Sequence, residues 1–313
     1  MKPHPLLVQG AMLLTMVFWG VSFVASKLIL TQITPLTYMG VRFAAASVLL
    51  AIVMGFRGRP HFSRRTHGLI ALTALAEPVA YFLFESFGLQ LITATTASLI
   101  IATIPLAVMV LAAIFLGEPI KLRGVVAVFV SITGIVLLVV GDPASTAPGS
   151  SHGLGILLVV GAVFSAAFYI TLARNLTQRH DPVNLTVVQT WWGAGVFIIL
   201  WSAQGPVARS LAPLTPAGWV ALAFLVVGAT VGAFLLYNWA LRHEQAGRAS
   251  LYINAIPVIT AFTGWILLDE RLALLQWIGG AMVLVSVRIS SGGSGTSDIP
   301  EAAEVAETVP PEA

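Results

Sequence analysis

Residues 82–122 of this chain recur without a gap at residues 234–274, which lie 152 positions further along. Each copy is an apolar segment with a proline near its middle and a glutamate at its end. Apolar composition alone produces chance matches, but it does not reproduce a proline and a glutamate 13 positions apart in both copies. The sequence is therefore an internal duplication, and its fold must contain the same long apolar element twice. The matched positions include Ala97/Ala249, Ser98/Ser250, Leu99/Leu251, Pro105/Pro257 and Glu118/Glu270.

The composition shows which solvent these apolar elements face. Hydrophobic residues make up 58% of the 313 residues and charged residues only 9%, whereas roughly 25% of an average soluble domain is charged. Runs of about 20 apolar residues, enough for a helix to cross a bilayer, recur along the chain. They lack the alternation of a membrane β-barrel, and helices satisfy their own backbone groups in lipid. The sequence predicts an all-α polytopic membrane protein. Because it contains no cysteine, disulfides and thiolate metal sites are excluded.

Ten membrane-spanning helices are predicted, five in each half of the chain. A Pro/Ser/Gly-rich linker at residues 142–152 separates a first repeat, residues 1–141, from a second repeat, residues 153–289. The tail at residues 290–313 is acidic and rich in Gly and Pro, and we expect it to be disordered. The expected helices are residues 8–30, 36–56, 68–89, 95–116, 124–141, 153–173, 183–203, 218–240, 249–268 and 274–290.

The distribution of Lys and Arg predicts the orientation of these helices. If the N-terminus is cytoplasmic, only Arg209 and Arg271 lie in loops on the opposite side, while Lys27 and Arg42 fall within helices. This bias predicts a multi-pass protein of the bacterial inner (plasma) membrane with both termini cytoplasmic. Because five helices is an odd number, the second repeat enters the membrane in the opposite sense, as in many secondary transporters. The cytoplasmic cations are then Lys2, Arg57, Arg59, Arg64, Arg65, Lys121, Arg123, Arg174, Arg179, Arg242, Arg248 and Arg288.

Four features of the sequence form a recognisable pattern: Trp19-Gly20 followed by Lys27, Pro35 followed by Arg42, the run Ala97–Glu118, and Pro182 with Gln189, which repeat Pro35 and Arg42 at an offset of 147. Together they resemble the EamA-type transporters of the drug/metabolite transporter superfamily. The resemblance covers about residues 10–290, and it implies ten helices arranged as two inverted EamA repeats. It also implies efflux of amino acids or other small organic metabolites, with helices 1–4 and 6–9 around a cavity and helices 5 and 10 at the periphery.

Four ionisable residues fall inside the predicted helices: Lys27, Arg42, Glu77 and Glu85. A charge at the bilayer centre costs about 2.5–3.5 kcal/mol on insertion scales, so each residue needs a partner or a function. By helix rise, Lys27, Arg42 and Glu85 lie at similar depth. They could form one cluster whose excess positive charge recognises a substrate carboxylate. Alternatively, Lys27 extends to the lipid headgroups, and Arg42 and Glu85 form a structural pair.

The spacing of Glu77, Tyr81 and Glu85 places them on one face of the third helix, which we expect to face a cavity. Burial away from a cation favours the protonated form of Glu77, so Glu77 and Glu85 are candidates for proton coupling. The alternative is a protonated carboxyl that is hydrogen-bonded between helices. Amides in lipid also need partners, which makes Asn238 and Asn254 candidate ligands. The predicted substrate-binding residues are Trp19, Ser22, Arg42, Tyr81, Glu85, Asn238 and Asn254.

Pro105 and Pro257 are expected to kink two repeat-related helices, because proline removes one backbone hydrogen bond. Such kinks suit either a central cavity or simple packing. Glu118 and Glu270 are expected to cap the next helix or to pair with a loop.

We therefore expect a secondary transporter that works by alternating access, and the resemblance implies that it exports amino acids or other small organic metabolites. The sequence contains neither a P-loop nor a metal-binding motif, and no catalytic residue, cofactor or nucleic-acid partner is predicted. The expected partners are the substrate and membrane lipid, with the protein a monomer or homodimer. Two alternatives remain open. An intramembrane enzyme acting on a lipid-linked substrate would need catalytic carboxylates or histidines clustered at one interface, and a membrane sensor or scaffold would not transport.

Overall fold

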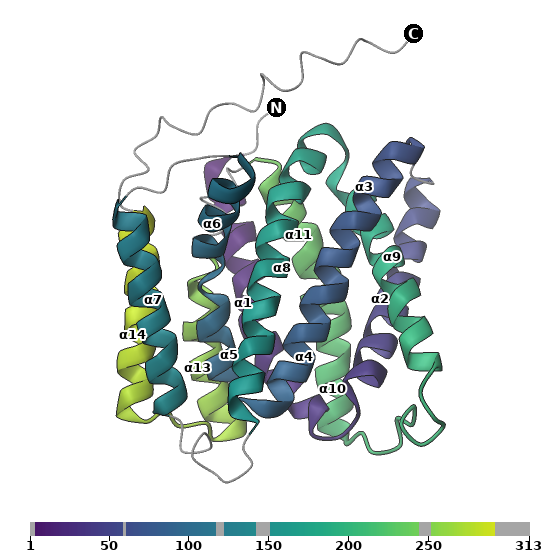
Figure 1. Cartoon of the computed structure of the whole chain (residues 1–313). Helices are drawn as coiled ribbons and strands as arrows, with labels where there is room; N and C mark the ends of the chain where they lie inside the picture. The colour runs from purple at the N-terminus through teal and green to yellow at the C-terminus, as the bar shows by residue number, and fades with distance from the viewer. Residues whose placement is uncertain (1–3, 59–60, 117–121, 142–150, 244–251, 292–313) are drawn as a thin grey trace.

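The structure is a computed structural model that describes residues 4–58, 61–116, 122–141, 151–243 and 252–291. These residues form helices that run up and down beside one another, and they contain no strand (Figure 1). Some of the positions singled out above lie outside the described residues: Glu118, Ser250, residues 142–150 of the expected linker and residues 292–313 of the expected tail.

The helices of the first repeat make five spans, two of which are composite. They are α1 (Pro5–Leu30), α2 (Pro35–Arg57), α3–η1–α4 (Arg64–Ala74, Leu75–Ala80 and Tyr81–Leu91), α5–α6 (Ala94–Ile101 and Ile104–Leu116) and α7 (Leu122–Val140). The helices of the second repeat are α8 (His152–Arg179), α9 (Pro182–Ser202), α10–η3–α11 (Pro216–Phe224, Leu225–Gly232 and Ala233–Leu241), α13 (Ala255–Leu268) and α14 (Leu274–Ser291). Among the described residues, eight stretches are long and apolar enough to cross a membrane, and α13 and α14 are shorter apolar helices. The predicted ten-span fold is confirmed.

Local sequence explains where several of these helices begin. Pro35, Pro182 and Pro216 each stand in the first turn of a helix, where the missing backbone N–H would have no partner in any case. The preceding residue is Thr34, Asp181 or Thr215, and its side chain accepts a hydrogen bond from a backbone N–H of the first turn.

The third and eighth spans each contain a wider helical turn at their centre. Adding the repeat offset of 152 to residues 75–80 (η1) gives residues 227–232, which lie within η3. In η1 the backbone of Glu77 is extended, directly before Pro78. In η3, which has no proline, the Thr230 hydroxyl donates to the carbonyl of Leu225, five residues earlier, over 2.8 Å. Such wide turns are rare in helices and are often found at functional sites.

The two spans with a shared proline are interrupted just before it. Ala102 and Thr103 separate α5 from α6, and Pro105 is the second residue of α6. Ile253 and Asn254 precede α13, and Pro257 is its third residue. Because proline has no N–H and its ring clashes with the carbonyl four residues earlier, the helix cannot continue through this position undisturbed.

The helices α7 and α14 form a pair at the edge of the bundle (Figure 1). Their backbones meet at Gly134 and Gly279. A Cβ atom on Gly134 would lie 2.7 Å from the carbonyl oxygen of Gly279, and the reciprocal distance would be 2.6 Å. Small residues allow helices to pack closely in membranes. This arrangement agrees with the peripheral position expected for the fifth and tenth helices.

The distribution of polarity is that of a membrane protein. Large apolar side chains are exposed on the outside of the bundle, including Phe129 (68%), Ile199 (68%) and Val220 (71%). Charged and amide side chains such as Arg42, Glu85 and Asn238 are at most 2% exposed. Lipid tails are as apolar as the exposed side chains, so the polar groups lie inside, where other helices supply their partners.

Hydrogen bonds between the two repeats close one end of the bundle, which holds residues 31–34, 92–93, 203–215 and 269–273 and is called here the sealed end. Thr34 donates to the side chain of Gln204 (2.9 Å) and Thr37 to the carbonyl of Ala208 (2.6 Å). The side-chain oxygen of Gln32 accepts from the backbone N–H of Thr215 (2.8 Å).

Two charged residues hold the turn between α4 and α5 at the sealed end. The ammonium of Lys27 donates to the carbonyls of Leu89 (2.5 Å) and Ile92 (2.9 Å), where α4 ends. The carboxylate of Glu270 accepts from the backbone N–H groups of Ala94 (2.8 Å) and Thr95 (3.0 Å), where α5 begins. Each charge has the sign that the helix dipole favours at that end. Glu270 therefore caps a helix of the other repeat, and not the helix that follows it.

Candidate functional site

A central cavity lies between the two repeats. Its volume is about 30 Å³, which is room for little more than water, so a larger solute can enter only when helices move apart. The polar and aromatic lining residues are Trp19, Ser22, Phe23, Glu77, Tyr81, Phe82, Glu85, Tyr169 and Tyr237, and the aliphatic ones are Ile101, Ile104, Ala166, Ile170, Ile253 and Ile256.

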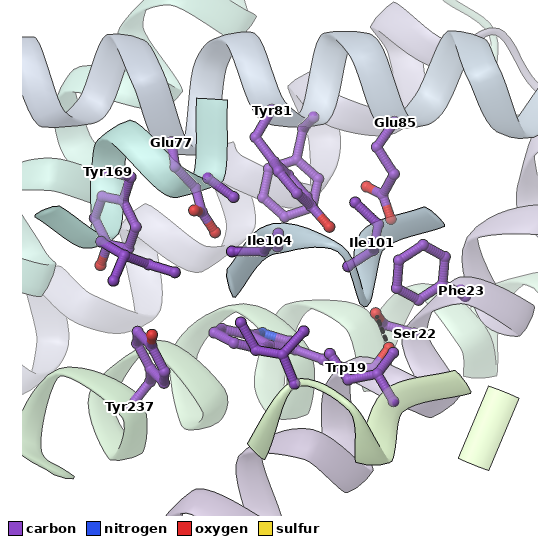
Figure 2. A pocket seen from close by; sticks show the side chains of 15 residues that line it. Trp19, Ser22, Phe23, Glu77, Tyr81, Glu85, Ile101, Ile104, Tyr169 and Tyr237 are labelled. Carbon is purple, nitrogen blue, oxygen red and sulfur yellow. Dashed lines mark hydrogen bonds between the residues drawn. The ribbon is translucent and has the colours of Figure 1, made fainter. Parts of the chain in front are cut away.

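Two carboxyl groups enter this cavity from the same span. Glu77, Tyr81 and Glu85 project from η1 and α4 toward Trp19 and Tyr237 on the other side (Figure 2). This is the face that the spacing of four residues predicts. Glu77 is 6% exposed and Glu85 is 2% exposed. The Oε2 atom of Glu85 is buried and has no hydrogen-bond partner in the part of the chain that the structure describes, although an unmatched buried polar atom is costly.

Aromatic rings form much of the remaining wall. Trp19 packs against Tyr237, with ring centroids 5.0 Å apart, and against Phe234, with centroids 5.8 Å apart. The hydroxyl of Tyr237, like Glu85 Oε2, is buried, and no described residue forms a hydrogen bond with it. The Ser22 hydroxyl donates to the carbonyl of Trp19 in its own helix (2.7 Å).

Arg42 lies behind the cavity wall and does not line the cavity. Its guanidinium stacks on the ring of Phe82, 4.4 Å from the centroid, while Phe82 itself lines the cavity. The side chain is 1% exposed, and it donates to the hydroxyls of Thr230 (2.7 Å) and Tyr38. Within the described part of the chain, no ion pair joins Arg42 to Glu85. Lys27 lies apart from both, at the α4–α5 turn described above.

The two asparagines occupy different environments, and neither lines the cavity. Asn238 accepts a hydrogen bond from the hydroxyl of Tyr169 (2.8 Å) and donates to Thr186 (2.8 Å), so it fixes the position of a cavity tyrosine. Asn254 lies at the interruption before α13, and its side-chain oxygen is buried with no hydrogen-bond partner among the residues that the structure describes.

The structure also reveals a contact that the sequence did not suggest. The side-chain amide of Gln189 in α9 donates to the backbone carbonyl of Glu77 (2.6 Å). In the sequence, Gln189 is the counterpart of Arg42 at the repeat offset of 147. That correspondence is the signal from which a structural role of Gln189 could have been predicted. Trp191 and Trp192, aromatic residues of the same helix, are 37% and 49% exposed and lie in a groove on the outside of the bundle.

The described residues contain no group of three or more His, Cys, Asp or Glu side chains that could hold a metal ion. The chemistry available to the cavity is therefore that of two carboxyl groups, tyrosine hydroxyls and aromatic faces. These groups can bind a solute and exchange protons.

Comparison with known proteins identifies the family. The EamA-like transporter family matches the chain twice, at residues 7–140 and at residues 153–292. An uncharacterized transporter of Archaeoglobus fulgidus is 31% identical over 277 residues, which cover 88% of this chain and 95% of that protein. The uncharacterized transporter YcxC of Bacillus subtilis is 28% identical over 275 residues, covering 86% of this chain and 87% of that protein.

More distant similarities agree with this identification. A WAT1-related chloroplastic protein of Arabidopsis thaliana is 27% identical over 284 residues, covering 86% of this chain and 66% of that protein. A protein of known crystal structure shares the fold, with a TM-score of 0.64 at 16% identity over 91% of this chain and 96% of the other. With both halves matched, the chain is a membrane protein of the EamA-like transporter family.

Proposed function

We propose that this protein is a secondary transporter that moves a small organic solute across the membrane through the central cavity. The observation that carries the proposal is the cavity itself, in which Glu77, Glu85 and several tyrosines are buried inside the helix bundle. Ionisable groups inside a membrane protein are costly and commonly mark a substrate or proton pathway. The names of the relatives point to a transporter rather than to an enzyme.

The proposed mechanism is alternating access by the two inverted repeats. In the present arrangement the inter-repeat hydrogen bonds of Thr34, Thr37 and Gln32 close the cavity at the sealed end. Opening this end requires these bonds to break, and the wide turns of η1 and η3 provide places where the third and eighth spans can bend. Repeats of opposite orientation exchange their arrangements in such a movement.

We further propose that the protein lies in the bacterial inner membrane with both termini in the cytoplasm and exports its substrate. The distribution of Lys and Arg supports this orientation, which places the sealed end on the side away from the cytoplasm. Glu77 and Glu85 are the proposed proton carriers, because a carboxyl that faces the cavity can bind a proton on one side of the membrane and release it on the other.

Cysteine accessibility tests alternating access directly, because the natural chain contains no cysteine. A Ser22→Cys variant places one thiol in the cavity. When an impermeant maleimide is added to one side of the membrane or to the other, the thiol should be labelled in both cases. A transported solute should change the ratio of the two labelling rates. Labelling from one side only under all conditions would contradict the proposed mechanism. An Arg209→Cys variant, which changes an exposed loop residue of the sealed end, reports on which side of the membrane this end lies.

A further inference from the structure

The cavity contains more negative than positive charge. Among the described residues, its lining includes the carboxyl groups of Glu77 and Glu85 but no Lys or Arg. The guanidinium of Arg42 is covered by the ring of Phe82 and is bound by two hydroxyl groups. Arg42 therefore supplies a positive charge beside the cavity, but no surface that a substrate carboxylate could reach.

Two unmatched oxygen atoms lie at repeat-related positions in this cavity. Glu85 and Tyr237 are separated by the repeat offset of 152 residues, and both line the cavity. Oε2 of Glu85 and the hydroxyl oxygen of Tyr237 are buried and have no hydrogen-bond partner among the described residues. The residues extend into the cavity from α4 and α11 (Figure 2). An ionised carboxylate offers a negative charge and only hydrogen-bond acceptors, so this position is suited to a cation, and a protonated amine could also donate a hydrogen bond to it.

The aromatic wall suits the same kind of ligand. Trp19, Tyr81, Tyr169 and Tyr237 line the cavity together with the two carboxyl groups (Figure 2). Aromatic faces attract ammonium groups, and the attraction is stronger where water is excluded. The isoleucines in the lining offer an apolar surface, which suits the hydrocarbon part of such a molecule.

We propose that the substrate is a small organic monocation, such as a protonated amine or a quaternary ammonium compound with an apolar body. Its ammonium group binds beside Glu85 and Glu77, and its apolar body lies against the aromatic and isoleucine walls. This inference rests on the proposed transport function and assigns the substrate class of the same cavity. It replaces the carboxylate-bearing substrate that Arg42 suggested in the sequence with one of opposite charge.

Charge balance predicts how many protons exchange for each cation. When Glu77 and Glu85 are both ionised, their two negative charges exceed the one positive charge of Arg42 by one, and an unbalanced buried charge is costly. One proton or one monocation restores neutrality, so each cation carried one way exchanges for one proton carried the other way. The other titratable groups around the two carboxyls are Tyr81 on the same span, Tyr169 on α8, Tyr237 on α11 and, behind Phe82, Tyr38 on α2.

Three phenols that differ only in their charged groups test the inference. Tyramine is a cation, tyrosine a zwitterion and 4-hydroxyphenylacetate an anion at neutral pH; phenyltrimethylammonium and choline are added as cations that cannot lose a proton. Binding is measured on the purified full-length protein by thermal shift and by competition with a labelled cation from the panel. We expect cations to bind at least about tenfold more tightly than tyrosine and the anion, and less tightly as the pH falls.

Carboxyl-to-amide variants locate the site. Glu85→Gln should weaken cation binding about tenfold or more and remove most of its pH dependence, and Glu77→Gln provides a second variant if Glu85→Gln does not fold. Asp269→Asn is the matched control, because Asp269 is an exposed carboxylate paired with Arg271 outside the cavity. The inference is overturned if tyrosine or the anion binds as tightly as the cations, or if both Gln variants bind cations as the natural protein does.

Counterflow in proteoliposomes separates this inference from the proposed function. If the protein exchanges a zwitterion or an anion but no cation, it is a transporter and the inferred substrate class is wrong. If the folded protein exchanges no member of any class, the proposed function fails and the inference fails with it.

Discussion

Gln189 donates a hydrogen bond of 2.6 Å to the backbone carbonyl of Glu77, the residue at which the third span is broken. Its repeat counterpart Arg42 donates to Thr230, in the wide turn of the eighth span, over 2.7 Å. The second helix of each repeat, α2 or α9, thus bonds to the irregular turn in the other repeat. The two contacts occupy equivalent positions in the two repeats.

Removing the Gln189 amide should destabilise the protein. Gln189→Ala leaves the buried carbonyl of Glu77 without its donor, and an unmatched buried acceptor costs about 1–3 kcal/mol. We expect a lower unfolding temperature in detergent and a slower transport rate. Ser202→Ala on the same helix is the control, since Ser202 is exposed and bonds only within α9. Equal unfolding temperatures for the two variants would show that the Gln189 contact contributes nothing.

Arg42→Lys should impair folding and rate without changing which solute is carried. Lysine keeps the positive charge but lacks the planar fork that bonds to Thr230 and Tyr38 while it stacks on Phe82. The measurement is competition by the phenol series in proteoliposomes. A change of preference from cation to anion or zwitterion would show that Arg42 contacts the substrate after all.

Glu85→Gln should flatten the pH dependence of transport. In the natural protein, raising the pH ionises the carboxyl groups and favours cation binding, whereas lowering the pH returns the proton and favours release. The glutamine side chain cannot bind a proton at this position, so initial rates measured across the pH range should vary less. A variant with the same pH profile as the natural protein would exclude Glu85 as a proton carrier.

Glu270→Gln should loosen the sealed end. Glu270 accepts two backbone hydrogen bonds and one from the Thr95 hydroxyl (2.7 Å) at the start of α5. A negative charge at a helix N-terminus contributes about 0.3–1 kcal/mol at an exposed site, and the glutamine loses this charge and one acceptor oxygen. In a protein that carries both Ser22→Cys and Glu270→Gln, the thiol should be labelled faster from the sealed-end side than with Ser22→Cys alone. The neighbouring substitution Asp269→Asn should leave this labelling rate unchanged. Slower labelling of the Glu270→Gln variant would be the opposite of the expected effect.

The sequence predicted the class of fold and one wall of the cavity for clear physical reasons. A long apolar run identifies a membrane-spanning helix, because lipid cannot hydrogen-bond to the backbone and a helix satisfies its own backbone groups. A spacing of four residues places Glu77, Tyr81 and Glu85 on one face of a helix. The shared prolines located both interruptions, since a helix cannot pass undisturbed through a residue that lacks a donor.

Contacts between the repeats could not be predicted in the same way. The direction of Arg42 depends on Phe82 and Thr230, which lie 40 and 188 positions away in the sequence. Glu270 caps α5 only because the fold brings the ninth span beside the fourth. The wide turn η3 has no proline to mark it, so its only signal was the repeat offset from η1. Aligning the two repeats position by position would also have paired Glu85 with Tyr237.

Counterflow with purified protein is the direct test of transport through the central cavity. Proteoliposomes are loaded with unlabelled amines, amino acids and organic acids, and the uptake of a matching labelled pool is followed for the natural protein, Glu85→Gln and Asp269→Asn. We expect the natural protein and Asp269→Asn to accumulate a labelled solute, predominantly an organic cation, and Glu85→Gln to accumulate little. Folded natural protein that accumulates nothing, or Glu85→Gln that matches it, would contradict a transport site in the central cavity.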